Sequence, residues 1–298
     1  MAAKKSWQET LFTTNKITIK LPSLKTPFKL IPFGDVHYYS PHCDQDRFHT
    51  FLDRCKRDDD EYTRYLTLGD LDDMMSASER GALDGKIHES SEATLDNFVL
   101  SQTTNLLDKL WFMKGRVLGM IEGNHHWKFR TGDLEGKTNT QYMANRLGAK
   151  FLGGLSVMRL CFKFENTSKK ACVDIIMAHG KAGGKLAGTS INQLEDMRRI
   201  FPLADIYIFG HDHKRGCWPD SALQITSGNG GGINIKQKRQ WFVRSGSFLR
   251  GFVDGQSTYA VGSLYKPTEL GTVRIEIGFS RDRKNGKDII STDIHTWS

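Results

Sequence analysis

Five short segments of the chain concentrate side chains that bind metal ions or transfer protons. They are Asp35-Val36-His37, Gly69-Asp70-Leu71-Asp72-Asp73, Gly123-Asn124-His125-His126, His179-Gly180 and Gly210-His211-Asp212-His213. Together they offer carboxylates, an amide oxygen and imidazoles. That mixture suits manganese, iron, zinc or nickel better than magnesium or calcium, which prefer shells made only of oxygen. The residue types therefore predict a centre for divalent metal ions.

The spacing within two of these segments indicates how their side chains are shared. In an extended chain, residues i and i+2 project to the same side. Asp35 and His37 are so spaced and are expected to face one site. His211 and His213 repeat the arrangement, and Asp212 between them is expected to point away and to be structural.

Each segment follows a short apolar stretch that is typical of a β-strand. The five stretches are 29–33, 64–68, 117–121, 171–178 and 205–209. In sheets with helical crossovers, ligand sites lie beyond the carboxyl ends of the strands. We therefore expect the five polar segments to meet at one edge of the structure.

Periodicity and capping residues predict the remaining elements. The first predicted helix begins after Asp44 and carries Phe48, Phe51, Leu52 and Cys55. A long helix is predicted over 92–112, with one apolar face formed by Leu95, Phe98, Val99, Leu106 and Leu110. A third helix covers 140–148 and closes at Gly148, and a fourth covers 191–200, with Ser190 and Gln193 as a capping box. Further strands are expected at 155–162, 239–248, 259–265 and 272–279.

Length and composition indicate a soluble globular protein. The chain has 298 residues, of which 38% are hydrophobic and 26% charged, without internal repeats. We expect a single domain over 1–298, with a helical insertion at about 74–113 and a strand-rich part at about 216–298. No stretch approaches the roughly 20 apolar residues of a membrane span, so no membrane is expected as a partner.

Charge and cysteine content bear on partners and compartment. The net charge of +8 favours anionic partners such as nucleic acid or nucleotides. The five cysteines are scattered and odd in number, and the N-terminal region shows no pattern of a secretory signal. These features predict free thiols and a cytoplasmic location.

The five motifs also resemble a known family. D-x-H, G-D-x-x-D, G-N-H, H-G and G-H-x-H, in this order over residues 35–213, are similar to the signature of the calcineurin-like metallophosphoesterase superfamily. The resemblance implies an α/β (α+β) fold, a four-layer sandwich of two mixed β-sheets flanked by helices. The C-terminal stretches "SGSFLRGF" and "YKPTELGTVRIEI" also look like phage-encoded members.

Carried over by motif, the resemblance implies a role for each ligand. One ion would be held by Asp35, His37 and His213, a second by Asn124, His179 and His211, and Asp70 would bridge both. The cofactors would be two divalent metal ions, manganese first, with iron, zinc or nickel as alternatives. Two ions roughly 3.5–4 Å apart clamp a phosphate and lower the pKa of a bridging water, whose hydroxide attacks in line.

The resemblance also implies catalytic residues. His125 resembles the general acid that protonates the departing oxygen, and Asp73 the carboxylate that orients this imidazole; Asp72 is an alternative to Asp73. His126 departs from the pattern, because the family usually has Asp or Glu there. It could contact substrate, support the site through a hydrogen bond, or have no functional role.

Basic and aromatic residues near the motifs are candidates for substrate binding. They are His126, Trp127, Lys128 and Arg130 beside the third motif, Lys214 and Arg215 after the last one, and the stretch 236–244. Interleaved cations and rings suit a phosphate backbone with stackable bases, although they also suit a strand with an exposed basic face.

The motifs favour one branch of the family over another. Protein Ser/Thr phosphatases carry G-D-x-V-D-R-G and G-N-H-E, whereas this chain has "GDLDDMM" and "GNHH". The double-strand-break repair exonucleases resemble it in G-D-x-x-D and G-H-x-H. We therefore predict a phosphodiesterase that acts on nucleotides or on DNA or RNA. The alternatives are a phosphomonoesterase and, in another class, a non-catalytic binding or scaffold protein.

Overall fold

The computed structural model describes residues 13–83, 86, 88–181, 184–227, 232–284 and 287–297. Its elements in chain order are β1 (Thr13–Leu21), β2 (Phe28–Phe33), α1 (Gln45–Arg57), β3 (Thr63–Thr67), α2 (Ala77–Leu83), α3 (Glu89–Leu110), β4 (Val117–Met120), α4 (Asn139–Leu147), β5 (Leu155–Phe164), β6 (Thr167–Ala178), α5 (Ala187–Ile200), β7 (Ile206–Phe209), β8 (Arg215–Ser227), β9 (Ile233–Ser245), α6 (Tyr259–Gly262), β10 (Arg274–Lys284) and β11 (Lys287–Trp297), with 3₁₀ turns at Trp111–Met113 and Gly132–Leu134.

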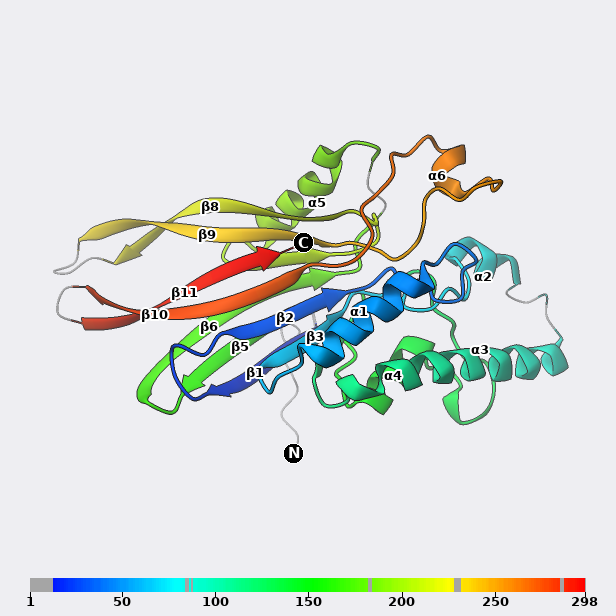
Figure 1. The fold of residues 1–298 in the computed structure, drawn as a ribbon, viewed down its shortest axis with the longest axis horizontal. Helices are drawn as coiled ribbons and strands as arrows, with labels where there is room; N and C mark the ends of the chain where they lie inside the picture. The colour runs from blue at the N-terminus through cyan, green and yellow to red at the C-terminus, as the bar shows by residue number, and fades with distance from the viewer. Residues whose placement is uncertain are drawn as a thin grey trace, which may run out of the picture.

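The strands form two mixed sheets (Figure 1). The six-stranded sheet has the order β1-β5-β6-β7-β9-β8, and the five-stranded sheet the order β11-β10-β2-β3-β4. In the first, β5–β6 and β8–β9 are antiparallel and the other neighbours parallel. In the second, β2–β3 and β3–β4 are parallel, while β10 is antiparallel to both of its neighbours. The two hairpins β8–β9 and β10–β11 extend away from α1, α3 and α4 (Figure 1).

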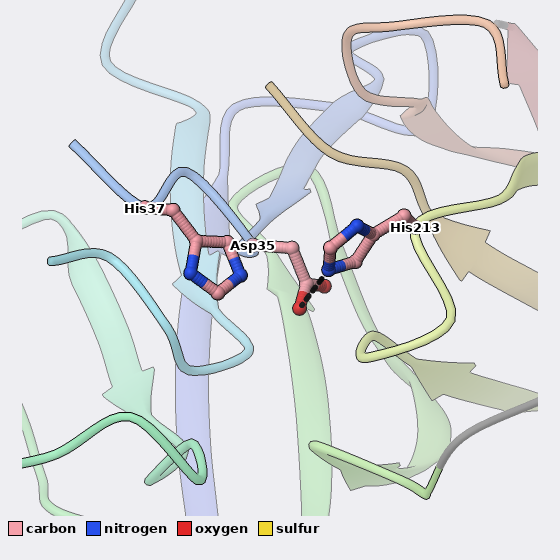
Figure 2. Close-up of side chains that lie close together, drawn as sticks. All are labelled: Asp35, His37 and His213. Carbon is pink, nitrogen blue, oxygen red and sulfur yellow. Dashed lines mark ion pairs between the residues drawn. The ribbon is translucent and has the colours of Figure 1, made fainter. Parts of the chain in front are cut away.

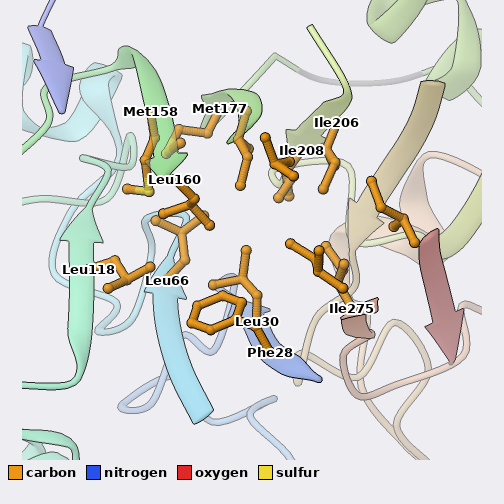
Figure 3. Packing of buried hydrophobic residues seen from close by; sticks show 14 of the residues in the cluster. Phe28, Leu30, Leu66, Leu118, Met158, Leu160, Met177, Ile206, Ile208 and Ile275 are labelled. Atoms are coloured by element: carbon orange, nitrogen blue, oxygen red, sulfur yellow. The ribbon is translucent and has the colours of Figure 1, made fainter. Parts of the chain in front are cut away.

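The main core fills the space between the two sheets (Figure 3). Leu30, Leu66 and Ile275 of the five-stranded sheet pack in one buried cluster with Leu160 and Ile208 of the six-stranded sheet. Burial of such side chains is the dominant favourable term in folding. The alternating burial along β5 follows from this arrangement, because one face of that strand points into the core.

Helices cover the outer faces of both sheets. On the five-stranded sheet, Phe48 of α1 and Leu106 of α3 belong to one buried cluster with Phe33 of β2. On the six-stranded sheet, Leu194 of α5 packs with Tyr207 of β7. The order is thus helix, sheet, sheet, helix, which confirms the predicted four-layer α/β sandwich of two mixed sheets. No helix in the described ranges combines the length and apolarity of a membrane span.

Several predicted elements differ in the structure. Residues 259–265, predicted as a strand, begin with the helical turn α6 instead, and α5 begins at Ala187 with Ser190 inside it, not as its cap. Phe98 was placed on the buried face of α3 but is 57% exposed. Strands β8 and β11 were not predicted individually. Asp44 caps α1 as expected, since its side chain accepts from the Arg47 amide.

Candidate metal centre

The five polar segments follow the carboxyl ends of strands in both sheets. Three of them follow β2, β3 and β4 of the five-stranded sheet, and two follow β6 and β7 of the six-stranded sheet. Since the sheets pack face to face, the strand ends converge at one edge of the sandwich. The apolar strands therefore bring together side chains that are up to 178 residues apart, from Asp35 to His213.

Three groups of side chains place possible ligand atoms within 4.8 Å of one another. They are Asp35, His37 and His213; Asp70, His179 and His211; and His37, Asp70 and His125. Figure 2 shows the first group, in which the Asp35 and His213 side chains lie next to each other and the His37 ring faces them. The segments after β2 and β7 therefore meet there.

Asp70 belongs to the second group and approaches the first through His37. Its Oδ2 is 3.1 Å from His179 Nε2 and 3.9 Å from His37 Nε2. His179 Nε2 is also 2.8 Å from Asn124 Oδ1 and 2.8 Å from His211 Nδ1, so Asn124 joins the second group. The other ring nitrogen of His179 faces the Leu68 carbonyl oxygen at 2.7 Å, which orients the ring. All seven predicted ligands are thus brought together.

The backbone at these positions has an uncommon conformation. Asp35, His37, Asp70, His211 and His213 have φ of 47°, 49°, 48°, 70° and 59°, in the left-handed region. Leu264 is the one further described non-glycine residue with positive φ. The paired ligands therefore meet through left-handed turns, and the extended chain assumed from the i, i+2 spacing is wrong. Asp and His enter this region more readily than most residues, but each such position costs about 1–3 kcal/mol.

Backbone hydrogen bonds between the loops hold this conformation. The amides of Val36 and His37 both donate to the Asp70 carbonyl oxygen, at 2.8 and 3.0 Å. The His211 amide donates to Asp35 Oδ2 at 2.8 Å. The loops after β2, β3 and β7 are therefore linked directly, and the linkage offsets the strain of their left-handed residues.

Close approach of two loops requires glycine at two positions. A Cβ at Gly123 would lie 1.9 Å from Asp70 Oδ1, and one at Gly69 would lie 2.5 Å from the Gly123 Cα. Neither distance is sterically possible, so a side chain at either position would displace Asp70 or the Asn124 loop.

The donor set fits divalent ions. Asp35 Oδ1 and His37 Nε2 are buried and have no hydrogen-bond partner within the described part of the chain. Buried polar atoms without partners are costly unless an ion or water satisfies them. Burial lowers the pKa of His213 to about 3 and that of His211 to about 4, which favours the neutral imidazoles that bind metals.

The two central carboxyl groups differ in their surroundings. Burial raises the pKa of Asp35 to about 7. Burial acts on Asp70 in the same direction, but the hydrogen bond and charge of His179 hold the pKa of Asp70 well below its usual range. The same contact raises the pKa of His179 to about 9 against the effect of burial. A divalent ion would compete with that shared proton, because metal-binding imidazoles must be neutral.

His125 and Asp73 form a close pair beside these groups. His125 Nδ1 is 2.6 Å from Asp73 Oδ1, and His37 Nδ1 is 3.3 Å from the same oxygen. Burial acts to raise the pKa of Asp73. Hydrogen bonds from the imidazoles of His125 and His37 outweigh burial and hold this pKa well below its usual range. The His125 amide donates to Asp70 Oδ1 at 2.9 Å, which fixes the loop against the central carboxylate.

Asp72 has a different task. Its carboxylate accepts from Thr103 Oγ1 at 3.1 Å and from Asn139 Nδ2 at 2.8 Å, and it joins the loop after β3 to α3 and α4. The structure therefore places Asp73, and not its neighbour Asp72, against His125.

His126 supports its own loop. Its Nδ1 is 2.8 Å from the carbonyl oxygen of Gly123, a hydrogen bond within the turn that carries Asn124. Its ring also lines a cavity of about 500 Å³ together with Lys128, Arg130 and Arg80. The contact matches the supporting role among the three roles left open for His126.

The structure separates the predicted substrate-binding residues. Trp127 is 1% exposed, and its indole donates to Asp96 at 2.7 Å beneath the same cavity, so its polar group is used within the protein. Lys128 is exposed at the cavity beside His126, and Arg130 lines the same cavity while pairing with Glu92 at 3.0 Å. These two cations lie at the wall of that cavity.

Lys214 and Arg215 make structural contacts instead. Lys214 Nζ donates to the Gly184 and Leu186 carbonyl oxygens and to Ser190 Oγ, at 2.8–3.0 Å, and so anchors the start of α5. Arg215 donates to the Leu270 carbonyl oxygen at 3.3 Å. Their side chains are directed to the protein, contrary to the expected contact with substrate phosphate.

Arg244, within the predicted basic stretch 236–244, is fully buried. It donates to the Gly210 carbonyl oxygen at 3.0 Å and lies 3.5 Å from Asp212 Oδ2, in the turn between His211 and His213. Asp212 thus points away from the ligands, as predicted. Arg244 was missed as a supporting residue because an Arg after "WFV" is also typical of an exposed strand face.

Comparisons with known proteins found neither a matching family model nor a matching curated protein. Vacuolar protein sorting 29 from Cryptosporidium parvum is a similar solved structure, 13% identical with a TM-score of 0.36, covering 91% of this chain and 99% of that chain. Vps29 from Entamoeba histolytica, solved with Zn²⁺, is 15% identical with a TM-score of 0.36, covering 90% and 99%. A predicted phosphoesterase from Streptococcus pneumoniae is 12% identical with a TM-score of 0.30, covering 90% and 99%. These likenesses are faint, and the fold and the site rest on the geometry described above.

Proposed function

We propose that the protein is a metal-dependent phosphodiesterase that hydrolyses nucleotides or nucleic acid. The observation that carries this proposal is the position of Asp70. It lies between two groups of metal-binding side chains, with the His125–Asp73 pair directly beside it. A shared carboxylate between two ligand groups is the arrangement that two-metal hydrolases of phosphate esters require.

One ion would be held by Asp35, His37 and His213. The other ion would be held by Asn124, His179 and His211, and Asp70 would bind both ions. When bound, two divalent ions supply positive charge against the phosphate and lower the pKa of an attacking water. The chain itself supplies the acid. Because His125 Nδ1 faces Asp73, its Nε2 is left to donate a proton to the departing oxygen.

Charge supports a nucleotide or nucleic acid as substrate. The chain carries a net charge of +8, and Lys128 and Arg130 line the cavity next to the His125 loop. A diester of DNA or RNA has further phosphates on both sides of the scissile bond, which such cations would bind. The resemblance to repair exonucleases favours the same class, with manganese as the first metal to test. A cytoplasmic location belongs to this proposal, on the basis of the dispersed cysteines.

Hydrolysis of bis-p-nitrophenyl phosphate and of p-nitrophenyl phosphate with added manganese tests the proposal. We expect the diester to be preferred and Asp70→Asn to lose turnover and to retain metal poorly. Preference for the monoester would make the protein a phosphomonoesterase. Full activity of Asp70→Asn would overturn the two-metal site, and metal binding without turnover of these esters, DNA or RNA would favour a binding or scaffold protein.

A further inference from the structure

The loop that carries Asn124 and His125 is held from outside by the segment 74–80. Arg80 Nη1 of α2 donates to the backbone carbonyl oxygens of Asn124 at 2.8 Å and of His126 at 2.7 Å. The Met74 amide donates to the carbonyl oxygen between them, that of His125, at 3.3 Å. Three consecutive carbonyl groups of the loop therefore point to one short segment of the insertion.

We propose that Arg80 is a positioning residue, which sets the place of Asn124 Oδ1 in the metal centre and of the His125 ring next to it. This inference rests on the proposed function and adds a residue to it. Opposite Arg80, Asn124 Oδ1 lies 2.8 Å from His179 Nε2 and the His125 amide donates to Asp70 Oδ1. The loop is thus fixed from both sides, and release of one side lets both side chains move.

The guanidinium suits this task better than other cations. It is planar, stays charged at every relevant pH and presents several N–H donors in a fixed arrangement. Hydrogen bonds from a charged donor are about twice as strong as neutral ones. A lysine ammonium at the same position carries three N–H donors, but these rotate freely on a flexible stem and do not hold the two carbonyl oxygens in one fixed arrangement.

Arg80 is itself held in place by its helix. Arg80 Nη1 also donates to the Met75 carbonyl oxygen at 2.5 Å. Ser76 and Glu79 cap the start of α2 reciprocally, since the Ser76 amide donates to Glu79 Oε2 at 2.7 Å and the Glu79 amide to Ser76 Oγ at 3.4 Å. The insertion is therefore built to present the guanidinium to the loop.

A direct contact with substrate is the competing role, because Arg80 also lines the cavity of about 500 Å³. The two roles differ in what they change. Loss of a positioning residue weakens metal binding and kcat without a large change in KM for a small diester. Loss of a substrate contact raises KM and leaves metal binding of the free protein unchanged.

Calorimetric titration of the metal-free protein with manganese tests the proposal, on Arg80→Ala and Arg80→Lys. Arg199→Ala is the matched control, because that side chain is 77% exposed and forms an ion pair with Asp196 of its own helix, α5. We expect Arg80→Ala to weaken one manganese-binding step by about 10- to 100-fold and to lower kcat. Added guanidinium ion should restore part of the manganese affinity and part of kcat in Arg80→Ala. Arg80→Lys should give values between those of Arg80→Ala and the unchanged protein.

Other outcomes overturn the proposal. Unchanged manganese binding with a raised KM would assign Arg80 to substrate, and equal loss of both binding steps with a lowered unfolding temperature would assign it to stability alone. Should Arg80→Ala not fold, Arg80→Lys carries the same comparison. Metal binding is measured without turnover, so failure of the phosphodiesterase proposal stays distinguishable from failure of this one.

Discussion

Asp72 and Asp73 are neighbours in sequence, yet their carboxyl groups meet different surroundings. Asp72 accepts from the neutral side chains of Thr103 and Asn139, and burial raises its pKa to about 6. Asp73 faces the imidazoles of His37 and His125, which hold its pKa well below the usual range despite burial. The two carboxyl groups therefore point in different directions from the same loop, so that Asp72 contacts α3 and α4 and Asp73 faces the metal centre.

His125→Ala tests the acid at this scale. We expect metal binding to persist in this variant. The His125 ring belongs neither to the group that contains Asp35 nor to the group that contains His211. Turnover should fall by roughly 10²–10⁴ for esters whose leaving groups have a high pKa, because these need a proton as they depart. Rates for a series of aryl and alkyl esters measure the effect.

His42→Ala is the control for that variant, because His42 lies outside the metal centre and its ring contacts the Gln256 side chain at 2.7 Å. Equal slowing of activated and unactivated esters in His125→Ala would remove the acid role from His125.

At the scale of elements, the start of α1 is held by the contacts of its capping residue, Asp44. Asp44 accepts from the Arg47 amide at 3.0 Å and pairs with Arg250 at 3.1 Å, next to the backbone bond from its own amide to the Phe248 carbonyl oxygen. The hydrogen bond from Arg250 lowers the pKa of Asp44. A carboxyl group whose pKa is lowered by folding stabilises the protein fully above its ordinary pKa, and the contribution is lost as the pH falls from that value through the lowered pKa of the folded state.

Asp44→Asn isolates the charge, because Asn caps helices as well as Asp. We expect the variant to be less stable at pH 7 by on the order of 0.5 kcal/mol and the difference to shrink as the pH falls below about 4. Urea unfolding at several pH values measures it. A difference that stays constant or grows toward low pH would contradict the assigned contacts.

Much of the element order was predictable from sequence because local features set it. The short runs at β4 and β7 are buried at every residue, and polar turns bound them on both sides. The turn α6 was mistaken for a strand because its helical turn depends on Thr258, whose carbonyl oxygen and hydroxyl accept from the amides of Gly262 and Val261. Phe98 fits the apolar spacing of α3 but is 57% exposed, whereas the neighbouring Val99 packs with Trp127 and Phe129.

The roles of Arg80 and Arg244 could not be predicted, because their partners are distant in sequence. Arg80 donates to residues 44 and 46 positions away, and Arg244 to one 34 positions away. The ligands themselves were found by type and by their place after strands. Their left-handed backbone conformation could not be predicted, because it depends on hydrogen bonds between loops that only the assembled sheets bring together.

At the scale of the whole molecule, the metal centre joins the two sheets. Asp70 belongs to the loop after β3 of one sheet, and His179 and His211 follow β6 and β7 of the other. Bound ions would therefore link both halves of the sandwich. They would also satisfy Asp35 Oδ1 and His37 Nε2, which have no hydrogen-bond partners among the described residues.

Removal of metal should lower stability. Manganese at about 100 times its dissociation constant is expected to add about 2.7 kcal/mol to the free energy of unfolding. Calorimetric scans with manganese and with a chelator measure the shift in Tm, and Asp70→Asn should show a smaller one. Identical Tm values under both conditions would contradict a metal centre that spans the two sheets.

The left-handed backbone at Asp35 and Asp70 bears on how such a chain would change if its chemistry were no longer selected. Glycine adopts this conformation without strain, and one base change converts an Asp codon into a Gly codon. Each such mutation would remove a ligand and relieve local strain at the same time. That relief would offset part of the stability lost with the carboxylate hydrogen bonds to the His211 and His125 amides. Folding would therefore resist the loss less than these buried contacts suggest, and selection for the reaction itself would carry more of the persistence of both carboxylates.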